Sequence, residues 1–126
     1  MSDKKKTILI IDDEEDFTFF VKLNLENTGD FVVHTSTDGK EGIEMAKTIK
    51  PDLILLDILM PAMHGTDVAE RLLQTTATKD IPLIYLTAVV RKEDLEANDG
   101  IIGGRKFIAK PISPEDLITE INASLF

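Results

Sequence analysis

The sequence has no cysteine among its 126 residues, and this absence removes one group of functions. A chain without thiols cannot form disulfides or use a cysteine nucleophile, and its composition agrees with a reducing, cytoplasmic location. Long hydrophobic runs are also missing. No apolar stretch approaches the roughly 20 residues of a membrane-spanning helix, so we expect no membrane association.

Basic residues are scarce as well. Lysine and arginine number 14 against 23 aspartates and glutamates, which gives a formal net charge of -9. So acidic a surface repels phosphate backbones, and we therefore expect no direct binding of nucleic acid. The acidity could simply favour solubility, or some of the carboxylates could converge on a cation. Their positions in the sequence decide between these interpretations.

Short apolar runs alternate along the chain with segments of helical periodicity. Residues 7–12, 52–57 and 81–87 are apolar nearly throughout, which is typical of strands buried on both faces of a parallel sheet. Residues 31–35 and 106–109 predict weaker strands.

Helices are predicted between these strands, at residues 14–27, 39–50, 66–74 and 114–125. Asp38 and Ser113 are typical N-caps, and Glu41 would complete a capping box with Asp38. Glycines interrupt the segment 91–104, which predicts only a short or mobile helix there. The apolar residues expected on the inner faces of the helices are Phe17, Phe20, Val21, Leu25, Ile43, Ala46, Ile49, Val68, Leu72, Leu73, Leu117, Ile118, Ile121 and Leu125.

This alternation of strands and helices predicts an α/β fold. We expect a three-layer, doubly wound, five-stranded parallel sheet of the flavodoxin-like type, with strand order 2-1-3-4-5. All 126 residues would form one domain, whether it stands alone or belongs to a longer protein. In such a sheet the ligand site lies beyond the carboxyl ends of the strands, where the first and third strands meet.

Polar residues stand at those carboxyl ends. Asp12 and Asp13 follow the first strand, Asp57 ends the third, Thr87 ends the fourth and Lys110 follows the fifth. Two like charges 4 Å apart repel by about 4 kcal/mol at an effective dielectric constant of 20. Three crowded carboxylates must therefore take up protons or bind a cation, and Mg²⁺ suits such oxygen ligands.

A carboxylate nucleophile, a cation, an ammonium and a hydroxyl together suit phosphoryl transfer to Asp57. Each residue also has a plainer explanation. Glu14, Glu15 and Asp16 would favour the start of a helix through its macrodipole, and an isolated lysine or threonine at a loop is usually structural. The plainer explanations do not account for all of these groups meeting at the ends of adjacent strands.

Four motifs, at residues 11–13, 52–61, 86–88 and 107–111, occur in this order with this spacing. With them the chain resembles, over essentially its whole length, the receiver domains of two-component response regulators. The resemblance implies that Asp57 is the phosphoacceptor. It also implies that Asp12, Asp13, Asp57 and the backbone carbonyl of Leu59 hold Mg²⁺ or Mn²⁺.

The resemblance assigns the remaining site residues too. Thr87 and Lys110 would contact the phosphoryl oxygens, and the Lys110-Pro111 peptide bond would be cis. Phe107 would be the switch aromatic, which turns inward when Thr87 moves toward the phosphoryl group. The plainer explanation for Phe107 is a simple core or edge-strand side chain.

Partners are likewise implied by the resemblance. A sensor histidine kinase or a histidine phosphotransfer protein would donate the phosphoryl group, and a downstream protein would read the surface formed by residues 91–104, 106–109 and 113–125. Phosphorylated copies could also pair through that surface. The chain would be a signalling switch rather than an enzyme, although it would catalyse its own phosphorylation and dephosphorylation.

Two other functions remain open at this point. An aspartate-nucleophile phosphohydrolase would need a second carboxylate two residues after Asp57, where this chain has Leu59. A receiver-like interaction module that is never phosphorylated would not need all five site positions filled, as they are here.

Overall fold

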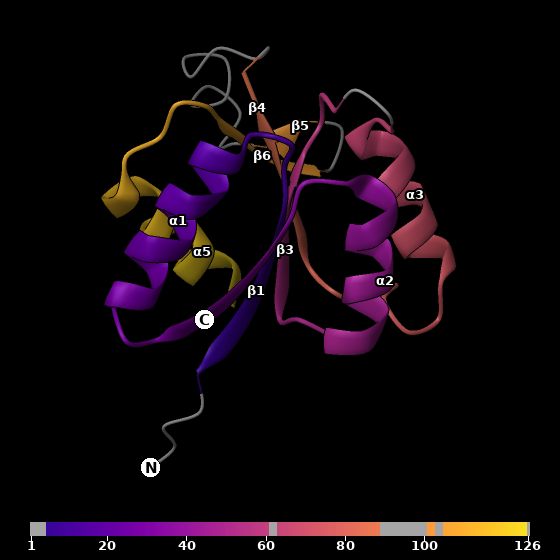
Figure 1. The fold of residues 1–126 in the computed structure, drawn as a ribbon, viewed down its shortest axis with the longest axis horizontal. Coiled ribbons are helices and arrows are strands. Elements are labelled where there is room, and N and C mark those ends of the chain that lie inside the picture. Colours follow the sequence, from indigo (N-terminus) through magenta and orange to yellow (C-terminus); the bar gives the residue numbers. More distant parts are fainter. Residues whose placement is uncertain (1–4, 61–62, 89–100, 103–104, 126) are drawn as a thin grey trace.

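Five parallel strands form the centre of the molecule in the computed structural model, which describes residues 5–60, 63–88, 101–102 and 105–125 (Figure 1). The order β2-β1-β3-β4-β6 confirms the predicted order of five parallel strands. The bounds of these strands are β1 Lys6–Ile11, β2 Phe31–Ser36, β3 Leu53–Asp57, β4 Leu83–Thr87 and β6 Arg105–Ala109.

A sixth strand, β5 (Ile101–Ile102), pairs antiparallel with β6 at the edge of the sheet. It falls in the segment 91–104, for which a short helix was predicted, so that prediction is wrong for these two residues. Two β-branched residues followed by two glycines are a hairpin signal, and we had interpreted the glycines only as helix breakers. Residues 91–100 and 103–104 lie outside the described residues.

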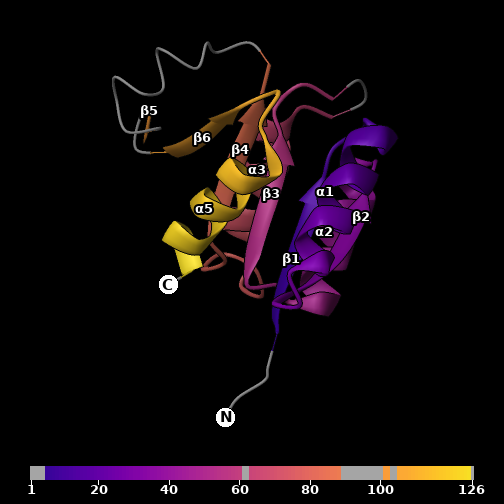
Figure 2. The ribbon, with the colours of Figure 1, turned by 90° about the vertical axis from the view of Figure 1, so that its left-hand side faces the viewer.

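The described helices cover both faces of the sheet. Helices α1 (Glu15–Asn27) and α5 (Pro114–Leu125) lie on one face, and α2 (Gly39–Ile49) and α3 (Gly65–Gln74) lie on the other (Figures 1 and 2). Alternate residues of β1 enter different cores: Ile8 and Ile10 pack with the first pair of helices, and Leu9 and Ile11 pack with the second. This explains why the strand is apolar at each position from Ile8 to Ile11.

Both predicted N-caps of the helices are confirmed, but the capping box is wrong. Asp38 accepts a hydrogen bond from the backbone N–H of Glu41, and Ser113 accepts one from that of Asp116. The Glu41 carboxylate accepts instead from the hydroxyl of Ser36, at 3.0 Å. In a capping box the Glu41 carboxylate would accept from the backbone N–H of Asp38. The hydroxyl of the buried Ser36, at the end of β2, is the donor instead.

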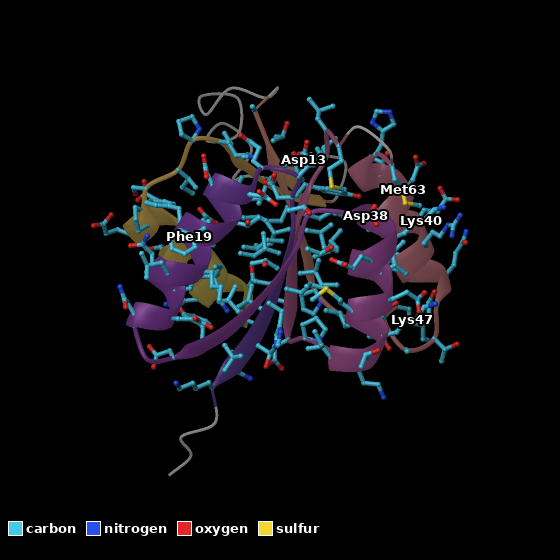
Figure 3. The ribbon with its side chains drawn as sticks, in the orientation of Figure 1. Asp13, Phe19, Asp38, Lys40, Lys47 and Met63 are labelled. Atoms are coloured by element: carbon cyan, nitrogen blue, oxygen red, sulfur yellow. The ribbon has the colours of Figure 1, made fainter. Side chains whose placement is uncertain are left out.

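Two apolar residues predicted to face the core are exposed. Phe20 on α1 is 41% exposed and Leu73 on α3 is 46% exposed. In α1 the buried residues include Val21 and Leu25, whereas Phe20 follows directly after the exposed Phe19, which Figure 3 labels. Within the described residues, no helix is both long and apolar enough to cross a membrane.

Strand register brings the polar residues together at the carboxyl ends of the strands, which form one edge of the sheet. Ile11 pairs with Leu56, so Asp12 and Asp57 leave adjacent strands at the same level. Thr87, at the end of β4, pairs with Ala109, the residue before Lys110. This edge is the end of the sheet at which Figure 3 shows Asp13.

Candidate functional site

Three carboxylates meet at this edge of the sheet. Asp12, Asp13 and Asp57 each offer one oxygen, and these oxygens lie within 4.8 Å of one another. The side chain of Asp12 is fully buried and Asp57 is 5% exposed, whereas Asp13 is half-buried. The three residues predicted from the strand ends are therefore brought together, and two of them are shielded from water.

The backbone fixes these carboxylates in place. The N–H of Asp12 donates to the carbonyl of Ser36, which ties the end of β1 to β2. One oxygen of Asp12 accepts from the N–H of Glu14 at 2.9 Å, and one oxygen of Asp57 accepts from the N–H of Leu59 at 3.3 Å. Both carboxylates are thus oriented by the first residues of the loops that follow their strands.

Crowding changes the acidity of Asp57. The pKa of this carboxyl is raised from 3.8 to about 7, chiefly by burial and next by the negative charge of Asp12, against the opposing effects of Lys110 and the Leu59 N–H. The result matches the expectation that clustered carboxylates take up protons or bind a cation. Near neutral pH the Asp57 carboxyl therefore exists in both its protonated and its ionised form.

Lys110 brings a positive charge to the site from the other end of the chain. Its ammonium donates to Asp12 at 2.9 Å and also to Glu14, and it lies 4.5 Å from the ring centre of Phe17. Burial alone would lower the pKa of Lys110, but the carboxylates of Glu14, Asp12 and Asp57 outweigh it and raise the pKa. The Lys110-Pro111 bond is cis, as predicted.

Glu14 is the site residue that sequence reasoning missed. We had assigned it to the helix macrodipole together with Glu15 and Asp16. The structure places its carboxylate against Lys110, while its backbone N–H holds Asp12. The signal was present in the sequence, since Glu14 directly follows two residues placed at the edge where Lys110 was expected.

Thr87 and Phe107 lie on neighbouring strands beside this cluster. Thr87 is fully buried, and the N–H of Lys110 donates to its carbonyl at 2.8 Å. Phe107 is half-buried and stacks on Tyr85, with ring centres 5.0 Å apart. These positions place both residues within the region that a switch would use, and the switch role itself remains a prediction.

The donor set fits a hard divalent cation. Within the described residues, the carboxylates of Asp12, Asp13, Asp57 and Glu14 gather around the single ammonium of Lys110, so the site holds an excess of negative charge. Oxygen ligands on two adjacent strand ends, with Asp13 partly open to solvent, suit an ion that retains some of its water. Burial and the charge of Asp12 both raise the pKa of Asp57, and a bound cation would favour its ionised form.

The model of the response regulator receiver domain family matches residues 8–122. The chain is 36% identical over 121 residues to the alkaline phosphatase synthesis transcriptional regulatory protein PhoP of Bacillus subtilis, covering 95% of this chain and 48% of PhoP. The fold matches the Vibrio cholerae chemotaxis protein CheY4 with a TM-score of 0.82, at 25% identity, over 97% of this chain and all of CheY4.

A further match is the receiver domain of the Pseudomonas aeruginosa sensor histidine kinase PA1611. It has a TM-score of 0.80 and 21% identity, covering 97% of this chain and 98% of that one, and its structure holds a magnesium ion in the active-site cleft. The fold, the strand-end cluster and the family match together define a phosphorylation-signalling module. This chain belongs to the response regulator receiver domain family, and it spans about half the length of the curated relatives it matches.

Proposed function

We propose that the chain is a phosphoacceptor switch that receives a phosphoryl group on Asp57 from a sensor histidine kinase or a histidine phosphotransfer protein. The observation that carries this proposal is the position of Asp57, a buried carboxylate at the end of β3, among Asp12, Asp13 and Lys110. Asp12 is buried in the same cluster, but its two oxygens already accept hydrogen bonds from the N–H of Glu14 and the ammonium of Lys110, which favours Asp57 as the acceptor.

The transfer follows from the chemistry of the groups present. A carboxylate oxygen of Asp57 attacks the phosphorus of the donor's phosphohistidine and forms an O–P bond. The P–N bond breaks, its electron pair stays on the imidazole nitrogen, and that nitrogen takes up a proton from solvent. Lys110 and the hydroxyl of Thr87 stabilise the negative charge on the phosphoryl oxygens.

Asp12, Asp13, Asp57 and the Leu59 carbonyl would hold Mg²⁺ or Mn²⁺. A bound divalent cation supplies charge neutralisation, both for the carboxylates and for the incoming phosphoryl group. Support comes from the donor set of this chain and from the magnesium ion held by the PA1611 receiver domain, which has the same fold.

The signal would be read on the side of the sheet that carries β6 and α5. When Thr87 moves toward the phosphoryl group, Phe107 turns inward and alters the surface formed by residues 106–109 and 113–125. Residues 91–100 and 103–104, also predicted for this surface, lie outside the described residues. A downstream protein, or a second phosphorylated copy, recognises the altered surface. We place this switch in the cytoplasm, where it makes its output through protein contacts without binding nucleic acid itself.

Intact-mass spectrometry tests this function. The chain is incubated with acetyl phosphate, with and without Mg²⁺, as the wild type, as Asp57→Asn and as Asp16→Asn. Asp16 is an exposed aspartate at the start of α1 and serves as the matched control. We expect the mass of one phosphoryl group to be gained by the wild type and by Asp16→Asn, only with Mg²⁺, and not by Asp57→Asn.

Either of two outcomes would contradict the proposal. A mass gain that persists in Asp57→Asn would place the acceptor elsewhere. Folded wild-type protein that binds Mg²⁺ but gains no mass, from acetyl phosphate or from a phosphorylated histidine donor, would indicate an interaction module that is not phosphorylated. Sustained release of phosphate from a range of monoesters would instead indicate a phosphohydrolase.

A further inference from the structure

The ammonium of Lys110 lies at the start of α1. It donates hydrogen bonds to Asp12 and Glu14 and sits over the ring of Phe17, 4.5 Å from the ring centre. The Lys110 side chain is 9% exposed. Within the described residues, both of its hydrogen bonds go to the segment that follows β1, and Asp57 influences it only through charge.

Two of these three contacts come from residues that no phosphoryl-transfer role requires. Glu14 is the N-cap residue of α1, and Phe17 lies in the first turn of that helix and packs against the core between α1, α5 and the sheet. A carboxylate and an aromatic face, held on one helix end, together form a binding place for an ammonium.

We propose that Glu14 and Phe17 are positioning residues that hold the Lys110 ammonium at α1 until a phosphoryl group on Asp57 draws it away. This inference rests on the proposed function of Asp57. Lys110 thus has two alternative positions, one at the start of α1 and one beside the phosphoryl oxygens. The balance between them sets how readily the site accepts the phosphoryl group.

The contacts of Glu14 and Phe17 with the Lys110 ammonium are weak enough to be reversible. Glu14 is 62% exposed at its side chain, so water and salt weaken its pairing with the ammonium. The phosphoryl group adds acceptor oxygens at the less exposed Asp57 side of the site, where charge interactions are stronger. The ring of Phe17 attracts the Lys110 ammonium from another side, so this contact leaves the hydrogen bond to Asp12 intact. The ring also packs against the methylene groups of the lysine.

The first test compares two single-charge variants from the same helix turn. Glu14→Gln removes the negative charge that pairs with Lys110 and leaves only a neutral amide acceptor. Glu15→Gln removes an equal charge from an exposed neighbour that makes no contact with Lys110 among the described residues. We expect Glu14→Gln to speed phosphorylation by acetyl phosphate about two- to fivefold, the range of an ion pair with one exposed partner. Glu15→Gln should stay within about 1.5-fold of the wild type.

The second test needs no phosphorylation. In metal-free protein with isotopically labelled lysine, the ring current of Phe17 should shift the ε-methylene protons of Lys110 upfield, a signal identified by its loss in Lys110→Met. Phe17→Leu should abolish the shift, Glu14→Gln should reduce it, and Glu15→Gln should leave it in place. Loading the wild type with Mg²⁺ and beryllium trifluoride, which mimics the phosphoryl group, should abolish it.

The positioning role is overturned by either of two results. One is that Glu14→Gln matches Glu15→Gln in both the shift and the rate; the other is that the shift survives in the loaded wild type. Failure of the proposed function is seen separately, because wild-type protein would then gain no phosphoryl group on Asp57. The metal-free comparison of the two glutamate variants would still decide whether Glu14 positions Lys110.

Discussion

Asp57 is the residue on which the proposed function depends, and its surroundings make its ionised form costly. Burial and the charge of Asp12 raise its pKa to about 7, far above the value of 3.8 for a free carboxyl. Between these two values the folded protein binds a proton that the unfolded chain has released. The stability contributed by this group is therefore present at low pH and is lost as the pH rises through about 7.

The first prediction concerns stability without metal. Asp57→Asn removes the ionisable group, so in chelator it should be more stable than the wild type at about pH 8, by as much as about 4 kcal/mol, and the difference should shrink toward pH 5. Urea unfolding of both proteins at the two pH values measures it. Asp16→Asn is the exposed control and should show no such trend; an advantage of Asp57→Asn that does not depend on pH would refute the prediction.

At the scale of elements, the sequence predicted most of what positions the site. Buried parallel strands need apolar residues on both faces, so β1, β3 and β4 stood out, and their last polar residues marked the functional edge. The sequence-based predictions were wrong where one pattern fits two structures. The glycines after Ile102 suit a hairpin as well as a helix break, and the Glu41 carboxylate found the Ser36 hydroxyl, a tertiary neighbour that local pattern cannot reveal.

The side-chain partners of Lys110 could not be predicted from the sequence either. The strand order placed Lys110 at the carboxyl ends of the strands, but no pattern in the sequence distinguishes Asp57 from the start of α1 as its partner. That choice depends on how close α1 lies to the end of β6. Contacts between residues nearly 100 positions apart, such as Lys110 with Asp12 and Glu14, are fixed by packing rather than by local pattern.

The close approach of α3 to the end of β3 gives a prediction at this scale. A Cβ added at Gly65 would lie 2.2 Å from the carbonyl oxygen of Asp57 and 2.7 Å from the Cα of Ile58, so backbone would have to move. Gly65→Ala should therefore cost about 1–3 kcal/mol in the free energy of unfolding, although alanine favours helices.

Urea unfolding checks this cost against Thr66→Ala, a substitution at an exposed position one residue further along α3. That control should change stability by no more than about 0.5 kcal/mol. Because the displaced atom belongs to Asp57, Gly65→Ala should also slow phosphorylation. Equal stability of the two variants would show that α3 can shift without affecting β3.

For the whole molecule, the sheet brings groups that are far apart in the sequence into one site. The site groups come from both ends of the chain, with Asp12 after β1 and Lys110 after β6, and the cores on the two faces of the sheet hold these ends in register. Under the proposed function, a change at Asp57 would reach β6 through Thr87 and Phe107. That function depends on one step, the attachment of the phosphoryl group to Asp57 itself.

Borohydride reduction followed by peptide mapping tests that step most directly. Protein treated with acetyl phosphate and Mg²⁺ is reduced, which converts an acyl phosphate on aspartate to homoserine, and the modified peptide is sequenced by mass spectrometry. We predict homoserine at position 57 alone, and none when Mg²⁺ is replaced by chelator. Homoserine at position 12 or 13, or a phosphoryl group that resists reduction, would contradict the account.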